Sequence, residues 1–173
     1  ITLKSKVIQI HFSQLCKFSQ LIREEYLISD VKNRLPHEIL KFQQENKIDI
    51  NNISNFFNLF KGETLTITNE RYRDFYKLSR FFKTKKLIKQ LKKYFNLHVT
   101  DIDFVIQLFK EEVEQNSDEN NFDLEYKSQF EQLMIYKIRD CLQNDNFQKL
   151  PTSFIYKIIE KCDENENLSD LMV

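Results

Sequence analysis

Apolar residues recur every three or four positions along most of the chain, and this spacing is typical of helices that bury one face. Thr68, Thr84 and Thr100 each stand before an apolar stripe, where a hydroxyl can cap a helix. Pro151 falls just inside another stripe, where a missing amide costs nothing. We therefore predict helices over residues 50–60, 69–82, 84–95, 100–113, 130–142 and 151–162.

The single glycine of the chain, Gly62, follows the first of these predicted helices. We expect it to occupy the position after the helix end, where φ is positive and a Cβ would clash. Residues 64–67, TLTI, then alternate between Thr and apolar side chains. This alternation favours a short extended piece before the next helix begins.

The first third of the chain gives a weaker pattern. Residues 4–10, KSKVIQI, alternate loosely and are predicted to form a short strand, whereas residues 38–42, EILKF, fit either a second strand or a helix led by Pro36. One Gly and two Pro leave few residues for β-turns, so an all-β fold is disfavoured. We predict an α+β fold, predominantly helical, with a small sheet before about residue 70.

Two stretches are polar and show neither the helical nor the strand spacing of apolar residues. Residues 115–123, QNSDENNFD, are predicted to form a loop or linker between subdomains. Residues 163–167, DENEN, are predicted to form a second solvated connection, after which an incomplete segment begins. Because the chain starts at Ile1 and ends on an apolar Leu-Met-Val, we also expect it to be part of a longer polypeptide.

An aromatic helix, a glycine turn, an extended piece and two helices resemble, in this order, the second half of the BTB/POZ domain, with its segment F-x-x-L-x-x-F-x-Y-T-G. The tyrosine of that segment is absent here. Residues 8–22, IQIHFSQLCKFSQLI, are similar to the strand, histidine and two helices of the family's first half, and residues 144–172 resemble the start of the helical BACK region. The matching residues are Phe56, Phe57, Leu59, Phe60, Gly62, Leu65 and Ile67, together with His11, Leu15, Ser19, Leu21 and Ile22.

The resemblance implies a division into three parts. Residues 1–98 correspond to a BTB/POZ-like domain, residues 99–123 to a connecting helix and linker, and residues 124–173 to a partial BACK-like helical region. It further implies a non-enzymatic protein–protein interaction module, an adaptor that associates with itself and recruits a partner.

Two sets of contact residues follow from the resemblance. Family members commonly dimerise through the first helix and the strand before it, which here implies an interface of Ile8, Ile10, Phe12 and Leu15. We expect the homodimer to be weak, because the chain starts close to that strand. Ile22-Arg23-Glu24 fits the hydrophobic-x-Glu signature of cullin-binding members, so Ile22 and Glu24 are candidate contacts to a cullin-type ubiquitin-ligase scaffold.

A second route to an adaptor function is open. Residues 35–40, LPHEIL, resemble the opening of an F-box, although leucine and proline followed by an acid and two apolar residues begin many helices. We rank this alternative below the BTB/POZ resemblance.

The composition bears on whether the chain folds and on its cellular compartment. Sixteen Phe and seven Tyr, with 41% apolar residues, argue against a disordered chain. Cys16, Cys141 and Cys162 are odd in number and far apart, which favours buried thiols in a reducing compartment. The sequence shows no signal peptide and no apolar run of membrane-spanning length. We expect a cytoplasmic protein, with the nucleus as the alternative.

Candidate chemistry is sparse. His11, His37 and His98 are scattered, none stands in a metal-ligand spacing, and one glycine cannot build a phosphate loop. A nucleophilic pair of Cys16 with His98, assembled by the fold, is the one catalytic arrangement left open. We predict no enzyme activity, no metal site and no cofactor.

Charge is unevenly distributed although the net charge is zero. Residues 71–93 hold ten Lys or Arg against Asp74, a balance of +9, whereas residues 101–125 hold nine acids against Lys110, a balance of −8. Such a basic block can bind nucleic acid, which gives the competing function class. We favour the polar face of an amphipathic helix instead, because the aromatic residues there lie on the opposite, apolar stripe.

Overall fold

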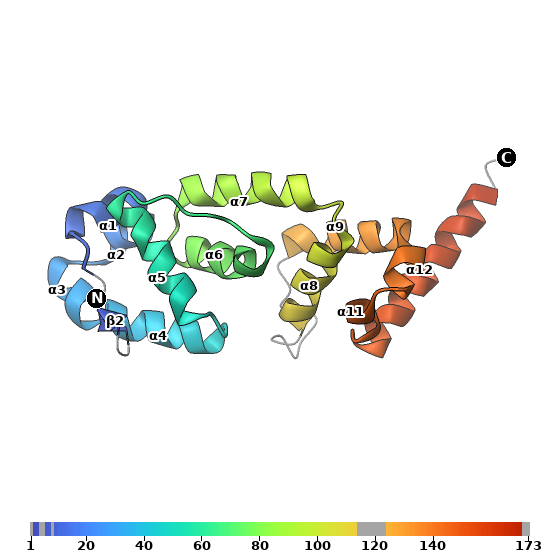
Figure 1. The fold of residues 1–173 in the computed structure, drawn as a ribbon, viewed down its shortest axis with the longest axis horizontal. Coiled ribbons are helices and arrows are strands. Elements are labelled where there is room, and N and C mark those ends of the chain that lie inside the picture. The colour runs from blue at the N-terminus through green and yellow to red at the C-terminus, as the bar shows by residue number, and fades with distance from the viewer. Residues whose placement is uncertain (1, 4–5, 8, 114–123, 171–173) are drawn as a thin grey trace. The chain divides into compact units, whose positions relative to one another are not determined.

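Helices form almost all of the regular structure in the computed structural model, which describes residues 2–3, 6–7, 9–113 and 124–170 (Figure 1). The chain divides into two units, residues 1–96 and 97–173. The elements of the first unit are β1 (Thr2–Leu3), β2 (Lys6–Val7), α1 (Phe12–Phe18), α2 (Gln20–Glu25), α3 (Ile28–Asn33), α4 (Leu35–Glu45), α5 (Ile50–Asn58), the 3₁₀ turn η1 (Leu59–Lys61), α6 (Asn69–Phe81) and most of α7 (Lys85–His98). The second unit contains α8 (Ile102–Val113), α9 (Leu124–Tyr136), α10 (Ile138–Leu142), α11 (Asp145–Gln148) and α12 (Thr152–Asp170).

The predicted small sheet is wrong. In the described part of the chain, strand pairing is limited to β1 and β2, which run antiparallel with Thr2 opposite Val7 and Leu3 opposite Lys6. Two residues per strand are too few for an independent sheet. The described part of the chain therefore belongs to a helical class, and the predicted α+β class with a small sheet is corrected accordingly.

Residues 38–42, for which a strand was one of two predictions, lie inside α4. Pro36 stands in the first turn of this helix, where its missing amide is tolerated. Leu35 and Ile39, four residues apart, are 0% and 1% exposed and anchor one helical face. The helical period therefore decides this segment, and the alternative of a helix led by Pro36 is confirmed.

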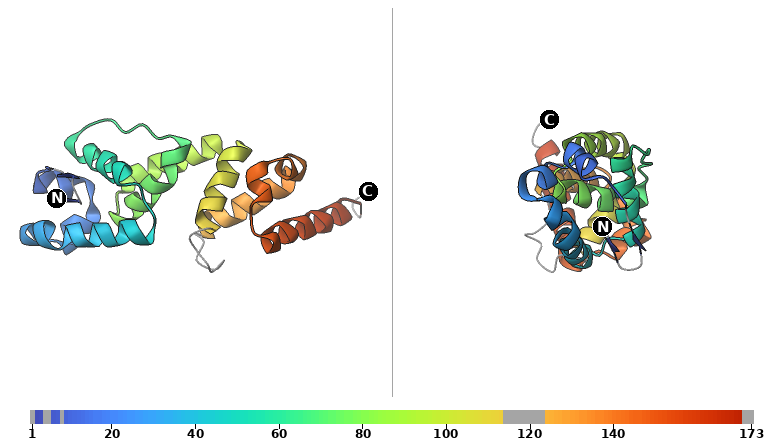
Figure 2. Two further views of the ribbon diagram at one scale, coloured as in Figure 1. Left: turned by 60° about the horizontal axis from the view of Figure 1, so that its bottom comes forward. Right: turned by 90° about the vertical axis from the view of Figure 1, so that its left-hand side faces the viewer.

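The turn at Gly62 is confirmed. α5 ends at Asn58, η1 adds one tighter turn, and Gly62 closes it with φ 90° and ψ 10°. The amide of Gly62 donates to the carbonyl of Leu59 at 3.0 Å. Figure 1 and Figure 2 both show the chain continuing from here as an open loop to the start of α6. The extended piece predicted over residues 64–67 therefore pairs with no described strand.

An aromatic cluster forms the centre of the first unit. The ring centroids of Phe56, Phe57, Phe60 and Phe82 lie 5.3 to 6.2 Å apart, mostly edge to face, and each side chain is at most 1% exposed. Edge-to-face pairs add about 0.5–1.5 kcal/mol each beyond the burial of area. This cluster holds the end of α6 against α5 and η1.

A buried polar network ties α6 to the turn between α4 and α5. The carboxylate of Asp74 accepts from the Asp49 amide at 3.0 Å and from Asn52 Nδ2 at 2.8 Å, and Arg73 Nη1 lies 3.3 Å from its other oxygen. Arg73 also donates to the carbonyl of Asn46 at 2.9 Å. A buried charge is tolerated when it is paired and hydrogen-bonded, which these contacts provide.

In the second unit, α8 packs against α9, α11 and α12. The ring of Phe109 stacks on Phe154 with centroids 4.0 Å apart and meets Phe130 edge-on at 6.2 Å. Asp101 caps α8, because its carboxylate accepts from the Phe104 amide at 3.2 Å. The cap predicted at Thr100 is therefore displaced by one residue.

Three further predictions concern the second unit. Residues 163–167, expected to form a solvated connection, are helical and continue α12, whose first turn begins directly after Pro151. Residues 115–123, predicted as a loop, lie outside the described residues. The helix predicted to connect two domains, α8, packs with α9 and α11 inside this unit.

Within the described ranges, no helix combines the length and the apolarity that a membrane crossing requires.

Candidate functional site

A pocket of about 500 Å³ opens on the first unit where α1, α2, η1 and the start of α7 meet. Its lining comes from three stretches of sequence, within residues 17–23, 59–63 and 83–90. The local sequence explains how two junctions bring these stretches together.

Ser19 forms the first junction. Its position between α1 and α2 is fully buried, and its hydroxyl oxygen accepts the amide of Ile22 at 3.1 Å, which caps α2. The same hydroxyl donates to the carbonyl of Phe82 at 2.7 Å. One serine thus fixes the α1–α2 corner against the end of α6.

Lys83 forms the second junction. The residue adopts φ 50°, a left-handed conformation that only glycine adopts without cost. The amides of Lys83 and Thr84 donate to the carbonyls of Arg80 and Ser79 at 3.0 and 2.8 Å, so the last turn of α6 is closed by a Schellman motif. The chain can then begin α7 directly at the pocket.

The floor of the pocket is apolar. Phe60 and Leu87 are 1% and 5% exposed, whereas Phe18 and Leu59 are half-buried. The ring of Phe18 stacks on that of Phe60 with centroids 5.7 Å apart. Since Phe60 belongs to the aromatic cluster, the floor is packed directly onto the core.

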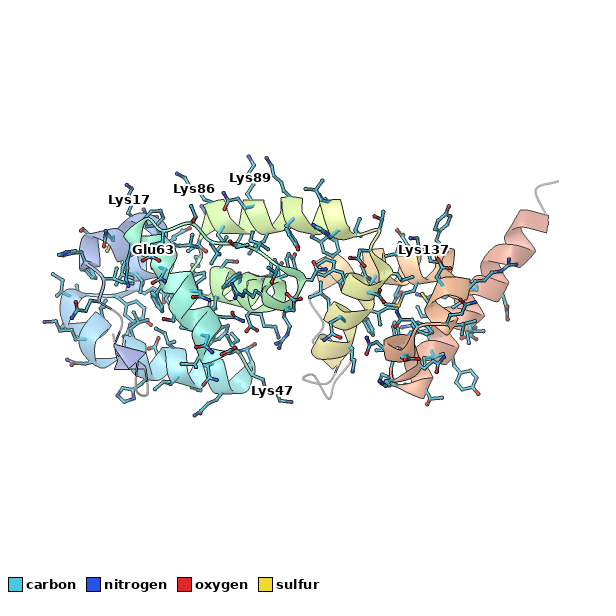
Figure 3. All side chains as sticks on the ribbon, viewed as in Figure 1. Lys17, Lys47, Glu63, Lys86, Lys89 and Lys137 are labelled. Atoms are coloured by element: carbon cyan, nitrogen blue, oxygen red, sulfur yellow. The ribbon has the colours of Figure 1, made fainter. Side chains whose placement is uncertain are left out.

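The rim of the pocket is basic. Five exposed cationic side chains line it against a single carboxylate, Glu63; the cations are Lys17, Arg23, Lys83, Lys85 and Lys86. Lys83 pairs with Glu25 at 2.7 Å, and this hydrogen bond raises the pKa of Lys83. Figure 3 shows Lys17, Glu63 and Lys86 on one side of the first unit, with Lys47 at the opposite side of the view.

The interface predicted from the resemblance is only partly accessible. Leu15 is 1% exposed and belongs to the core of the first unit, while Ile10 and Phe12 are half-buried. Ile8 lies outside the described residues. A contribution of Leu15 to a dimer is therefore excluded in this conformation, and self-association stays a prediction that rests on Ile10 and Phe12.

Of the two predicted cullin contacts, one is buried and the other is exposed. Ile22 is 0% exposed, so its side chain cannot reach a partner. Glu24 is exposed and accepts from Gln20 Nε2 at 2.6 Å. Arg23, the middle residue of the tripeptide, is the one that lines the pocket.

The basic block at residues 71–93 is not one continuous patch. Arg73 is 7% exposed and occupied with Asp74 and Asn46, and Lys83 is paired with Glu25. The exposed cations of α7 remain on the surface; they are Lys85, Lys86, Lys89 and Lys93.

Two of the three candidate thiols make backbone contacts in the fold: Cys141 Sγ donates to the Met134 carbonyl and Cys162 Sγ to the Ile135 carbonyl, both at 3.8 Å. Among the described residues, no three His, Cys, Asp or Glu side chains gather as a metal site would require. Cys16, Cys141 and Cys162 are free thiols, and burial raises the pKa of Cys141 to about 11. His98 packs edge-on against Phe104 at 6.1 Å.

Sequence reasoning missed the pocket as a site. It identified Lys83, Lys85 and Lys86 as members of a basic block, but not Lys17, Phe18 or Leu59 as their neighbours. The signal that could have found them is Ser19 itself, a short polar residue between two apolar-periodic stretches, because a polar side chain that is buried between helices needs a hydrogen-bond partner.

Comparison with known proteins gave no match: no family model, no curated protein and no solved structure matches the chain. The resemblance to BTB/POZ and BACK regions therefore stays a prediction.

Proposed function

We propose that this chain is a non-enzymatic protein-interaction module, and that its first unit recruits a partner protein through the pocket between α1, α2, η1 and α7. The observation that carries the proposal is the apolar floor enclosed by a polar rim. Protein interfaces concentrate their binding energy in such places, where an apolar anchor fills a pocket and polar groups around it exclude water.

The packing of the site onto the core supports the same function. Its floor is anchored in the aromatic cluster, and its walls are fixed by the Ser19–Phe82 hydrogen bond. A preformed site loses little conformational entropy on binding, which favours affinity. Self-association and recruitment of a ligase scaffold are narrower forms of this proposal.

A photo-cross-linking experiment tests the proposal. Benzoylphenylalanine is placed at Glu63 or Gln90, which line the pocket, and at Lys47 as a control, in cells that express the protein. We expect a discrete cross-linked protein from the two pocket positions, identified by mass spectrometry, and none from Lys47. The same adducts from all three positions, or none from the pocket, would contradict the proposal.

The identified protein is then purified and its affinity measured against two matched variants. Leu59→Asp places a charge in the pocket, whereas Leu27→Asp changes a leucine that is 71% exposed elsewhere on the unit. We expect the first to weaken binding by about tenfold or more, as loss of an interface anchor does, and the second by less than about twofold. Equal effects would place the docking site elsewhere.

Nucleic-acid binding is the second candidate function. The observation that favours it is the row of exposed cations on α7, where Lys85, Lys89 and Lys93 follow at four-residue spacing and so share one helical face. The structure offers no aromatic side chain in that row for base stacking.

A further inference from the structure

We infer that the segment recognised by the pocket is acidic and carries one large apolar side chain. The inference rests on the proposed function and adds the chemistry of the partner: carboxylates bind the basic rim, and the apolar side chain enters the floor between Phe18 and Leu87.

The first step is the surplus of positive charge at the rim. Lys83 has Glu25 as its partner, and Glu63 is the one carboxylate in the lining. Across the described residues, neither Arg23 nor Lys85 nor Lys86 forms an ion pair. Gathered around one concave site, these cations create a positive potential that only an anionic partner neutralises.

The second step is the charge at the start of α7. The N-terminal end of a helix carries a partial positive charge, so acidic residues are favoured in its first turn and basic residues are not. The first turn of α7 contains no acid and begins with Lys85 and Lys86. The two lysines and the partial positive charge of the helix end repel each other, which costs the free chain some stability. A bound carboxylate would relieve this repulsion.

The third step is the shape of the pocket. Its volume of about 500 Å³ lies in the range of ~300–1,000 Å³ typical of ligand sites, and its floor is formed by Phe18, Leu59, Phe60 and Leu87. A purely ionic ligand would leave this apolar surface in water. A Phe or Leu side chain that fills it gains about 1.5–3 kcal/mol from burial.

The same features favour a peptide over a single-stranded nucleic acid. The rings of Phe18 and Phe60 stack on each other, so one face of each is already occupied. Glu63 stands at the rim, where it would repel a phosphate backbone. A peptide can place its backbone amides near Glu63 and its carboxylates near the lysines.

Fluorescence anisotropy tests the inference with a labelled peptide of sequence DEEFLDEE. We expect saturable binding that weakens as salt rises, since the rim charges are solvent-exposed. Two control peptides separate the contributions: QNNFLNQQ lacks the charges and DEEGSDEE lacks the apolar anchor. We expect each to bind at least about tenfold more weakly than DEEFLDEE, the change that 1.4 kcal/mol produces.

Two charge-reversal variants of the full chain provide the matched control. Lys86→Glu reverses a charge at the rim, and Lys47→Glu reverses one at an exposed lysine outside the pocket. We expect the first to weaken DEEFLDEE by about tenfold and the second by less than about twofold. Equal loss in both variants would show that net charge alone attracts the peptide, and would overturn the inference.

The outcomes also separate the inference from the proposed function. If cross-linking from Glu63 and Gln90 identifies a partner but DEEFLDEE does not bind, the function stands and the acidic chemistry is wrong. If QNNFLNQQ binds as well as DEEFLDEE, the rim charges play no part in recognition. If a single-stranded oligonucleotide binds more tightly than DEEFLDEE and Lys86→Glu abolishes its binding, the site is a nucleic-acid site.

Discussion

The hydroxyl of Ser19 donates to the carbonyl of Phe82 across 2.7 Å, although the two residues are 63 positions apart in the sequence. The contact joins the α1–α2 corner to the end of α6, and the two sides of the pocket begin at these two residues. A single buried hydrogen bond therefore holds together two of the three stretches that line the pocket, and the Phe18–Phe60 stack adds the third.

Removal of this contact should destabilise the first unit. Ser19→Ala loses the bond to Phe82 and the cap of α2, and we expect a loss of about 2 kcal/mol in the free energy of unfolding. The matched control is Ser13→Ala, an exposed serine in α1, which should stay within about 0.5 kcal/mol of the parent. Urea denaturation followed by circular dichroism measures both; equal stability of the two variants would show that the bond contributes nothing.

The stability cost of a substitution at Gly62 should depend only on how readily the new residue adopts the left-handed backbone conformation. An added Cβ would meet no atom within 4 Å, so the cost of Gly62→Ala comes from φ 90° and is expected to be about 1 kcal/mol. Gly62→Asn should cost less, because Asn adopts the left-handed conformation more readily. Thermal melts of the three proteins check this order, and an alanine variant as stable as the parent would contradict it.

Tyr26 should make stability fall at high pH. Burial, and then its hydrogen bond to Glu38, raise the pKa of Tyr26 to about 12, against a smaller opposing effect of Arg34. Below about pH 10 the phenol is protonated in both states; between about pH 10 and 12 it ionises in the unfolded chain while the folded chain holds its proton, so folding loses free energy as pH rises.

The comparison is the free energy of unfolding at about pH 9 and about pH 11. We expect the parent to lose about 1 kcal/mol more than Tyr26→Phe, which has no phenol to ionise. Tyr136→Phe is the control, because Tyr136 is 85% exposed, and this variant should follow the parent. A loss in Tyr26→Phe as large as that of the parent would mean that other groups cause the pH dependence.

The basic block should not bind nucleic acid at physiological salt. Arg73 and Lys83 are engaged in structural contacts, and the row of exposed lysines on α7 has no aromatic side chain for base stacking, so the block is not one continuous nucleic-acid surface. Gel retardation with duplex and single-stranded probes measures this. Retardation at micromolar concentration or below that Lys85→Glu and Lys89→Glu weaken, together with a steep dependence on salt, would favour the competing function.

Local pattern predicted most of the helices and the turn at Gly62, because helix period and the left-handed conformation of glycine are properties of adjacent residues. The small sheet is the wrong part of the prediction. Residues 38–42, left open between strand and helix, are helical, and residues 64–67, predicted only as an extended piece, pair with no described strand. Residues 38–42 and 64–67 are too short for their period to separate strand from helix or loop. Long-range pairing decides such segments, and the described residues provide no partner strand.

The pocket could not be predicted from local pattern. Lys85 and Lys86 were identified as basic residues, but Lys17 and Leu59 reach them only through the Ser19–Phe82 contact and the Phe18–Phe60 stack. The side chains of Leu15 and Ile22, which were expected to contact a partner, are buried. Both lie on the apolar faces that pack α1 and α2 into the core.

The central claim is that an acidic segment binds in the pocket of the first unit. The most direct measurement is an NMR titration of the ¹⁵N-labelled chain with the peptide DEEFLDEE. The claim predicts the largest amide shift changes at Gln20, Gly62 and Lys86, one from each stretch of sequence that lines the pocket. Changes that leave Gly62 unmoved and instead follow Lys89 and Lys93 along α7 would contradict it.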